Sequence, residues 1–249
     1  MSERDRALTT LRRRGVLDAL VWAQRSAYGQ VRQDYNPDGG HKQSWIGFSG
    51  HTYLIDRLDR VFQCGDYAAP RGEGPIGRDV LAAGITDDDF RTMPHLPAGT
   101  VVRHDFNGSP GWSADGWRWL LTSYRFGEVH RIRWPEHRKT KQLVARQPHD
   151  DGGLFPLTTL TTVPVQPTLI LAHAMDPETV ESELFLGRSR WNPDGGDAWV
   201  WCEDLLAQPP ARTTWSEPHL PIAAADPTVP DADVALRRAV GGPRAIGDA

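Results

Sequence analysis

The character of the chain changes at Pro97, and this change constrains the fold more than any other feature. Before it, apolar residues recur with the period of an α-helix, from Val16 to Val31 and again over 53–62. After it come short segments rich in β-branched and aromatic residues, separated by Gly, Pro or charged turns. These segments are 99–105, 116–126, 128–134, 140–146, 167–173, 182–191 and 197–204. The pattern predicts an α+β protein, with a helical N-terminal part packed on an antiparallel β meander or small barrel.

Three regions follow from this pattern along the 249 residues. We expect a mainly helical part over 1–95 and an antiparallel β part over 96–205 that shares one core with it. The remainder, 206–249, is rich in Pro, Ala and Asp, which predicts an extended tail. A short helix is expected within 231–241, where Gly241 ends it.

Local signals predict several helix ends. Ser2 suits the N-cap of a first helical turn, and Gly15 is expected to break or bend the following run. Thr52 suits the N-cap of a helix over 53–62. The acidic run 86–90 resembles a metal site, but a cap at Thr86 explains it better, because Asp side chains suit the positive end of a helix dipole.

The motif Asn-Pro-Asp-Gly-Gly occurs twice, at 36–40 and 192–196. Each residue in it favours a tight turn, since Pro presets φ and Gly tolerates a left-handed conformation. Strand-like segments flank the second copy, which predicts a β-hairpin over 183–203, whereas the first copy is expected to end a helix. We interpret the repeat as one turn used twice rather than as a duplicated unit.

Composition excludes several classes of protein. The N-terminus is charged and has no apolar signal segment, and no stretch approaches the apolar length of a membrane span. Cys64 and Cys202 are the two cysteines, in no recognisable pattern, so a cytoplasmic protein is expected, although a disulfide between them stays open. The common nucleotide-loop, hydrolase-elbow and zinc motifs are absent.

Positive charge concentrates in 103–146, which carries nine basic and four acidic residues within a chain of net charge −4. If 118–126 and 129–134 are paired strands, alternation presents arginines beside aromatic rings. Such a surface suits single-stranded nucleic acid, by phosphate neutralisation and base stacking, while the alternative is a solvated sheet face with Trp in the core. The predicted nucleic-acid contacts are Arg118, Arg125, Arg131, Arg133, Trp134, Arg138, Lys139 and Lys141.

Two other functions compete with nucleic-acid binding in a processing or defence assembly. The first is an enzyme of hydrolase type with a pocket near His104, for which Asp105 and His130 are further candidate catalytic residues. An Asx-type turn at Asp105 is the structural alternative. The second is a structural subunit that contacts protein partners through the C-terminal tail. His104, His130 and His137 match no metal-binding spacing, and the sequence indicates no particular cofactor.

Overall fold

The computed structural model describes residues 1–70, 76–148 and 166–207. The chain divides into two units, Met1–Ala211 and Arg212–Ala249, and all described residues belong to the first. Apart from its first two residues, the expected tail over 206–249 lies outside the described residues, and so do its short helix and its partner contacts.

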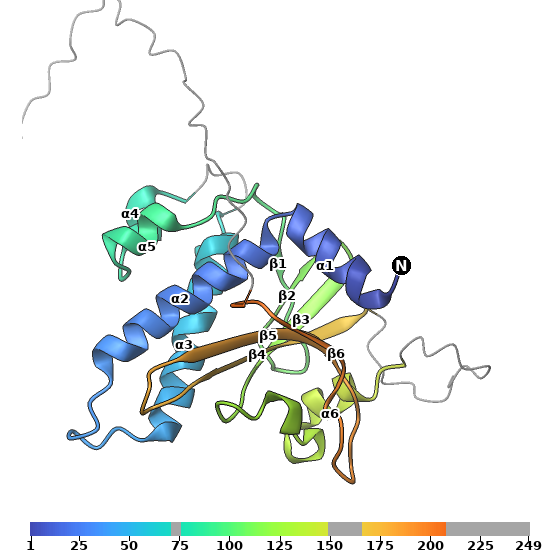
Figure 1. Cartoon of the computed structure of the whole chain (residues 1–249). Helices are drawn as coiled ribbons and strands as arrows, with labels where there is room; N and C mark the ends of the chain where they lie inside the picture. Colours follow the sequence, from blue (N-terminus) through green and yellow to red (C-terminus); the bar gives the residue numbers. More distant parts are fainter. Residues whose placement is uncertain (71–75, 149–165, 208–249) are drawn as a thin grey trace, which may run out of the picture. The chain divides into compact units, whose positions relative to one another are not determined.

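One six-stranded sheet with helices on both faces forms the described unit (Figure 1). The helices are α1 (Glu3–Arg13), α2 (Val16–Asp34), α3 (Gln43–Phe62), α4 (Arg78–Ala82), α5 (Asp87–Thr92) and α6 (Lys139–Ala145). Short 3-10 helices are η1 (Gly65–Tyr67), η2 (Val129–Arg131) and η3 (Trp134–Glu136). The strands are β1 (Val102–Arg103), β2 (Gly111–Ala114), β3 (Trp117–Ser123), β4 (Thr168–Met175), β5 (Ser182–Ser189) and β6 (Trp199–Asp204).

The strands follow their order in the sequence across the sheet, from β1 to β6. Neighbouring strands are antiparallel except β3 and β4, which run parallel, with Ser123 opposite His173. The predicted α+β class is therefore confirmed. The uninterrupted antiparallel meander is wrong at one place, because a parallel pair needs a crossover connection and cannot be joined by a tight turn.

Strand alternation divides the buried side chains into two layers. In β3, Trp119 and Leu121 join a core with α1, α2 and α3, while Leu120 joins a second core with α6. In β4, Leu169 and Ile170 divide in the same way. Successive strand residues point to opposite faces, so a sheet covered on both sides buries side chains from both faces, and every residue of β4 is buried.

Most of the predicted helix ends and turns are confirmed. Ser2 caps α1 through the backbone N–H of Asp5, and Gly15, at φ +73°, separates α1 from α2. The first Asn-Pro-Asp-Gly-Gly motif follows the end of α2, and Asn36 there accepts a hydrogen bond from Gly39 at 2.9 Å. The second copy connects the antiparallel strands β5 and β6. Thr86 caps α5 by accepting from a backbone N–H at 3.0 Å.

Helix α3 is longer than the sequence indicates. The prediction over 53–62 with Thr52 as N-cap is wrong at its start, since Thr52 lies inside the helix. The missed half contains two glycines and has weak helix propensity. Packing on α2 stabilises it: Ile46 is buried, and a Cβ at Gly50 would lie 2.9 Å from the hydroxyl of Tyr28.

Two predicted strands are also wrong: 128–134 contains the 3-10 helix η2 and ends at the first residue of η3, and 140–146 lies almost wholly in α6. Side chains rather than a strand ladder bind the backbone of this region. Asn192 accepts from the Trp134 N–H at 3.1 Å and donates to the Ile132 carbonyl at 2.8 Å. The buried indole of Trp134 donates to the Ala198 carbonyl at 2.6 Å, which fixes this segment against the β5–β6 connection.

Both cysteines are free, so Cys64 and Cys202 do not pair. Among the described residues, no helix has the length and apolar character required to cross a bilayer.

Candidate functional site

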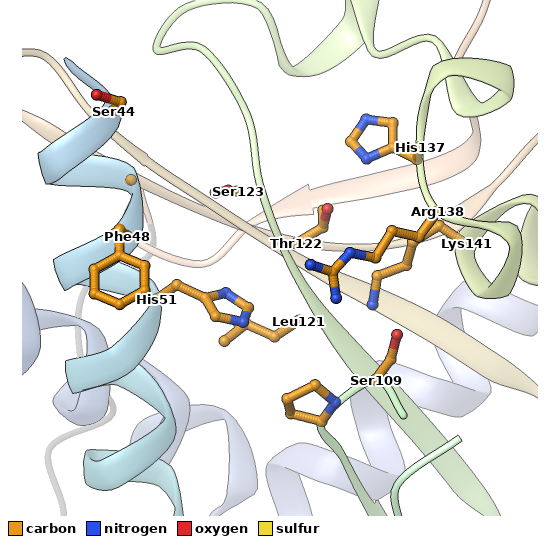
Figure 2. Close-up of a pocket in the computed structure, with 12 residues that line it drawn as sticks. Ser44, Phe48, His51, Ser109, Leu121, Thr122, Ser123, His137, Arg138 and Lys141 are labelled. Carbon is orange, nitrogen blue, oxygen red and sulfur yellow. The ribbon is translucent and has the colours of Figure 1, made fainter. Parts of the chain in front are cut away.

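A pocket of about 510 Å³ lies between the first half of α3, the end of β3 and the start of α6 (Figure 2). This volume is in the range of small-ligand sites. Its titratable and hydroxyl-bearing lining includes His51, Ser109, Thr122, His137, Arg138 and Lys141. The residues come from elements that are distant in the sequence, so the folded sheet is what brings them together.

The charges that line this pocket all have the same sign. Among its described lining residues there are an arginine, a lysine and two histidines, but no carboxylate. A second pocket, of about 810 Å³, differs, because its Asp56 pairs with Arg60 at 3.2 Å and accepts a hydrogen bond from Tyr67 at 2.6 Å. In the second pocket a carboxylate pairs with the arginines, whereas the described lining of the first contains no acidic partner for its positive groups.

Lys141 is the most unusual group in the pocket. Its side chain is buried, and within the described part of the chain its Nζ has no hydrogen-bond partner. Burial, with a further contribution from the charge of Arg138, lowers the pKa of Lys141 to about 7. A buried ammonium without a partner is costly, so the site favours either a neutral amine or a bound anion.

His51 belongs to a chain of three side chains that runs from the pocket into the core. His51 Nδ1 lies 3.4 Å from His173 Nε2, and His173 Nδ1 lies 2.7 Å from the hydroxyl of Tyr28. Complete burial, together with the nearby His51 and Lys141, lowers the pKa of His173 to about 3, so this ring is neutral. Burial and the charges of Lys141 and Arg138 also lower the pKa of His51. His51 is thus a neutral imidazole near neutral pH.

Phe48 lies on the rim of the pocket, one helical turn before His51 on α3 (Figure 2). Its side chain is 74% exposed, and Phe48 is one of the few large apolar residues at the described surface. An aromatic ring in water beside a positive pocket offers a surface on which a planar group can stack.

The predicted nucleic-acid contacts separate into three groups. Arg138 and Lys141 line the pocket, and Arg138 projects from the wall opposite α3 (Figure 2). Arg118 and Trp134 are 4% and 0% exposed, which leaves no ring or guanidinium surface for a strand to contact. The others are exposed outside the pocket: Arg125, Arg131, Arg133 and Lys139. Because 128–134 is not a strand, no flat arginine and aromatic sheet surface forms here.

The candidate catalytic residues His104, Asp105 and His130 do not line this pocket. His104 is exposed, and its Nδ1 lies 3.3 Å from the Ser113 hydroxyl. Asp105 accepts from the Gly111 N–H at 3.0 Å and pairs with a neighbouring arginine, as expected for a residue that stabilises a turn. His130 is exposed on η2, with its ring 6.4 Å from that of a phenylalanine in β5.

Phe48, His51 and the buried partners of His51 were not among the predicted site residues, and His137 was considered only as a metal ligand. A local signal was available for the α3 residues: an aromatic and a histidine three positions apart in a run of Gly and Ser. Cys64 is not part of the pocket, and its Sγ lies 3.5 Å from Oδ1 of Asp59. Burial and that carboxylate raise the pKa of the Cys64 thiol to about 12, which makes it a poor nucleophile.

The chain matches no protein-family model, no curated protein and no solved structure.

Proposed function

We propose that the protein binds single-stranded nucleic acid, with a backbone phosphate in the pocket of His51, Arg138 and Lys141 and a base against Phe48. The observation that carries this proposal is the unpartnered, buried amine of Lys141 beside Arg138, in a pocket without carboxylates among its described lining residues. A cytoplasmic location and membership of a processing or defence assembly remain part of the proposal. The two free cysteines support the location.

A phosphodiester suits this pocket because of its charge and its oxygens. The guanidinium of Arg138 presents a planar fork that matches two phosphate oxygens, and Lys141 supplies a point charge from the same side. The hydroxyl groups of Ser109 and Thr122, which also line the pocket, offer further hydrogen bonds. Binding an anion also raises the pKa of Lys141 toward its ordinary value, so the ligand removes the cost of burying the ammonium.

Single strands are favoured over duplexes by the position of Phe48. A base stacks on an exposed ring only when it is free of its neighbours in a duplex. Outside the pocket, Lys139 follows Arg138 in the sequence and is also exposed, which adds positive charge next to Arg138.

Fluorescence anisotropy with a labelled, mixed-sequence single-stranded RNA tests this proposal. We expect salt-sensitive binding by the wild type, as phosphate contacts release counterions. Arg138→Ala should weaken binding about tenfold, the value of one charge-assisted hydrogen-bonded contact. Phe48→Ala should weaken it by a similar factor of about ten, because stacking on an aromatic ring contributes about 1–3 kcal/mol per base.

The matched control is Arg131→Ala, which removes an exposed arginine of the same segment that does not line the pocket. Its effect should be about threefold or less, since exposed charges act weakly through screened electrostatics. Absence of wild-type binding at low salt, or equal losses for Arg131→Ala and Arg138→Ala, would refute a phosphate site in this pocket.

A further inference from the structure

The pocket holds the groups for acid–base chemistry as well as for binding. His51 faces Arg138 and Lys141 across the cavity (Figure 2), and the other ring nitrogen of His51 contacts a buried histidine. Simple anion binding needs positive charge, but it does not need an imidazole connected to a buried chain. The connection therefore points to a function in which His51 gains and loses a proton.

Because His173 is neutral, the directions of its two hydrogen bonds, to Tyr28 and to His51, depend on each other. It has one N–H and one lone pair, so if Tyr28 donates to Nδ1, then Nε2–H donates to His51. If the hydrogens are reversed, His51 donates its Nδ1–H to His173 and presents the lone pair of Nε2 to the pocket. In that second arrangement His51 is a base, and the imidazolium that it forms keeps its hydrogen bond to His173.

We propose that this pocket cleaves single-stranded RNA by attack of a ribose 2′-hydroxyl on the adjacent phosphate, with His51 as the base and Lys141 as the acid. The inference rests on the proposed function, since it requires the same phosphate position. A ligand that carries its own nucleophile needs a proton acceptor, a proton donor and charge stabilisation. The pocket supplies these through His51, Lys141 and Arg138, respectively.

The step balances without any other reactant. The 2′-oxygen forms a bond to phosphorus while its proton passes to Nε2 of His51, and the bond from phosphorus to the 5′-oxygen breaks. The ammonium of Lys141 gives a proton to that departing oxygen. The products are a 2′,3′-cyclic phosphate and a 5′-hydroxyl, and exchange with water then returns both side chains to their starting protonation states.

The protonation states of the free site agree with these roles. The pKa of His51 is lowered, so the ring is available as a base at neutral pH. The pKa of Lys141 is lowered to about 7 in the free site, so a substantial fraction is protonated at the same pH, and a bound phosphate favours the protonated form that the acid requires. Tyr28 and His173 act as positioning residues, because they reach the substrate only through His51.

The first experiment compares three labelled oligonucleotides of one sequence with the full-length protein: RNA, 2′-O-methyl RNA and DNA. We expect all three to bind and only the RNA to be cleaved, with 2′,3′-cyclic phosphate ends. His51→Ala should slow cleavage by a factor of about 100 or more. His104→Ala, an exposed histidine outside the pocket, is the control and should match the wild type.

A modified RNA separates the acid from the phosphate contacts. When sulfur replaces the bridging 5′-oxygen at one position, the leaving group departs without a proton. Lys141→Met should therefore lower kcat on ordinary RNA but keep kcat near the wild type on the sulfur-substituted RNA, with a raised KM on both because the phosphate contact is lost. His51→Ala should keep a low kcat on both. For the positioning residues, Tyr28→Phe should lower kcat at unchanged KM and displace the acidic limb of the pH–rate profile.

Failure of this inference is distinct from failure of the proposed function. RNA that binds but stays intact overturns cleavage alone, as does equal cleavage of 2′-O-methyl RNA. Equal activity of His51→Ala and the wild type assigns the cleavage to another site or a contaminating nuclease and also overturns it. No binding of any oligonucleotide at low salt removes both proposals together.

Discussion

Replacement of Lys141 by Met should stabilise the protein, and by an amount that depends on pH. The structure buries this ammonium and lowers its pKa from 10.5 to about 7. Below pH 7 both the folded and the unfolded states carry the charge, so the folded state bears the full cost of burial. Between the two pKa values Lys141 is neutral in the folded state. The cost therefore falls as the pH rises toward the pKa of lysine in the unfolded chain. Above about pH 10.5 both states are neutral, and the cost vanishes.

The magnitude follows from the interval between the two pKa values. Each pH unit in that interval corresponds to about 1.4 kcal/mol of the free energy of unfolding. The buried ammonium therefore costs about 4 kcal/mol at pH 7 and about 2 kcal/mol at pH 9. Lys141→Met keeps most of the length of the side chain and removes the charge, so its advantage over the wild type should shrink by about half between these two pH values.

Urea unfolding followed by tryptophan fluorescence, at several pH values from 6 to 9, measures this difference. Lys139→Met provides the control, because Lys139 is the neighbouring lysine at the surface and should show little change. Inorganic phosphate should raise the stability of the wild type more than that of Lys141→Met, since it binds only the charged site. If the stability difference between Lys141→Met and the wild type stays constant with pH, or if the variant is less stable, burial does not destabilise the charged form of this amine.

Three further predictions concern the scaffold of the site. Asn192→Ala removes hydrogen bonds of 2.8 and 3.1 Å to the η2–η3 region and should lower the free energy of unfolding by about 2 kcal/mol, measured in urea. Gly187→Ala should lower it by about 2 kcal/mol or more, as a Cβ would lie 2.7 Å from the Trp199 ring, and an unchanged value would contradict this close packing. The pKa values of Cys64 and Cys202 are raised to about 12, so iodoacetamide at pH 8 should modify the folded protein far more slowly than the unfolded chain, as mass spectrometry would show.

Features with a local cause could be predicted from the sequence. Gly15 breaks a helix because of its own backbone freedom, and the turn at 36–40 depends on the residues inside it. The helical period from Val16 and the strand character of 167–173 also follow from neighbouring residues, and both elements form. These elements establish the α+β class.

The pocket could not be predicted in the same way, because its properties arise from contacts between distant segments. The first half of α3, which contains Phe48 and His51, is a weak helix by propensity and forms by packing on α2. Lys141 resembles any other basic residue in the sequence, and only the fold buries it. The composition of 128–134 resembles that of a strand, but its aromatic and β-branched residues pack in the region of the 3-10 helices η2 and η3.

The parallel contact between β3 and β4 divides the sheet into two halves, each built from consecutive antiparallel strands. Strands within a half are close along the chain, but the contact of Ser123 with His173 closes a much longer loop. Loop closure of this kind slows folding, so we expect the two halves to form early and to join late. Thr122 lines the pocket on one half, and His173 supports His51 from the other. In refolding experiments, the ability to hold a ligand should therefore appear with the slowest phase, after most of the secondary structure has formed.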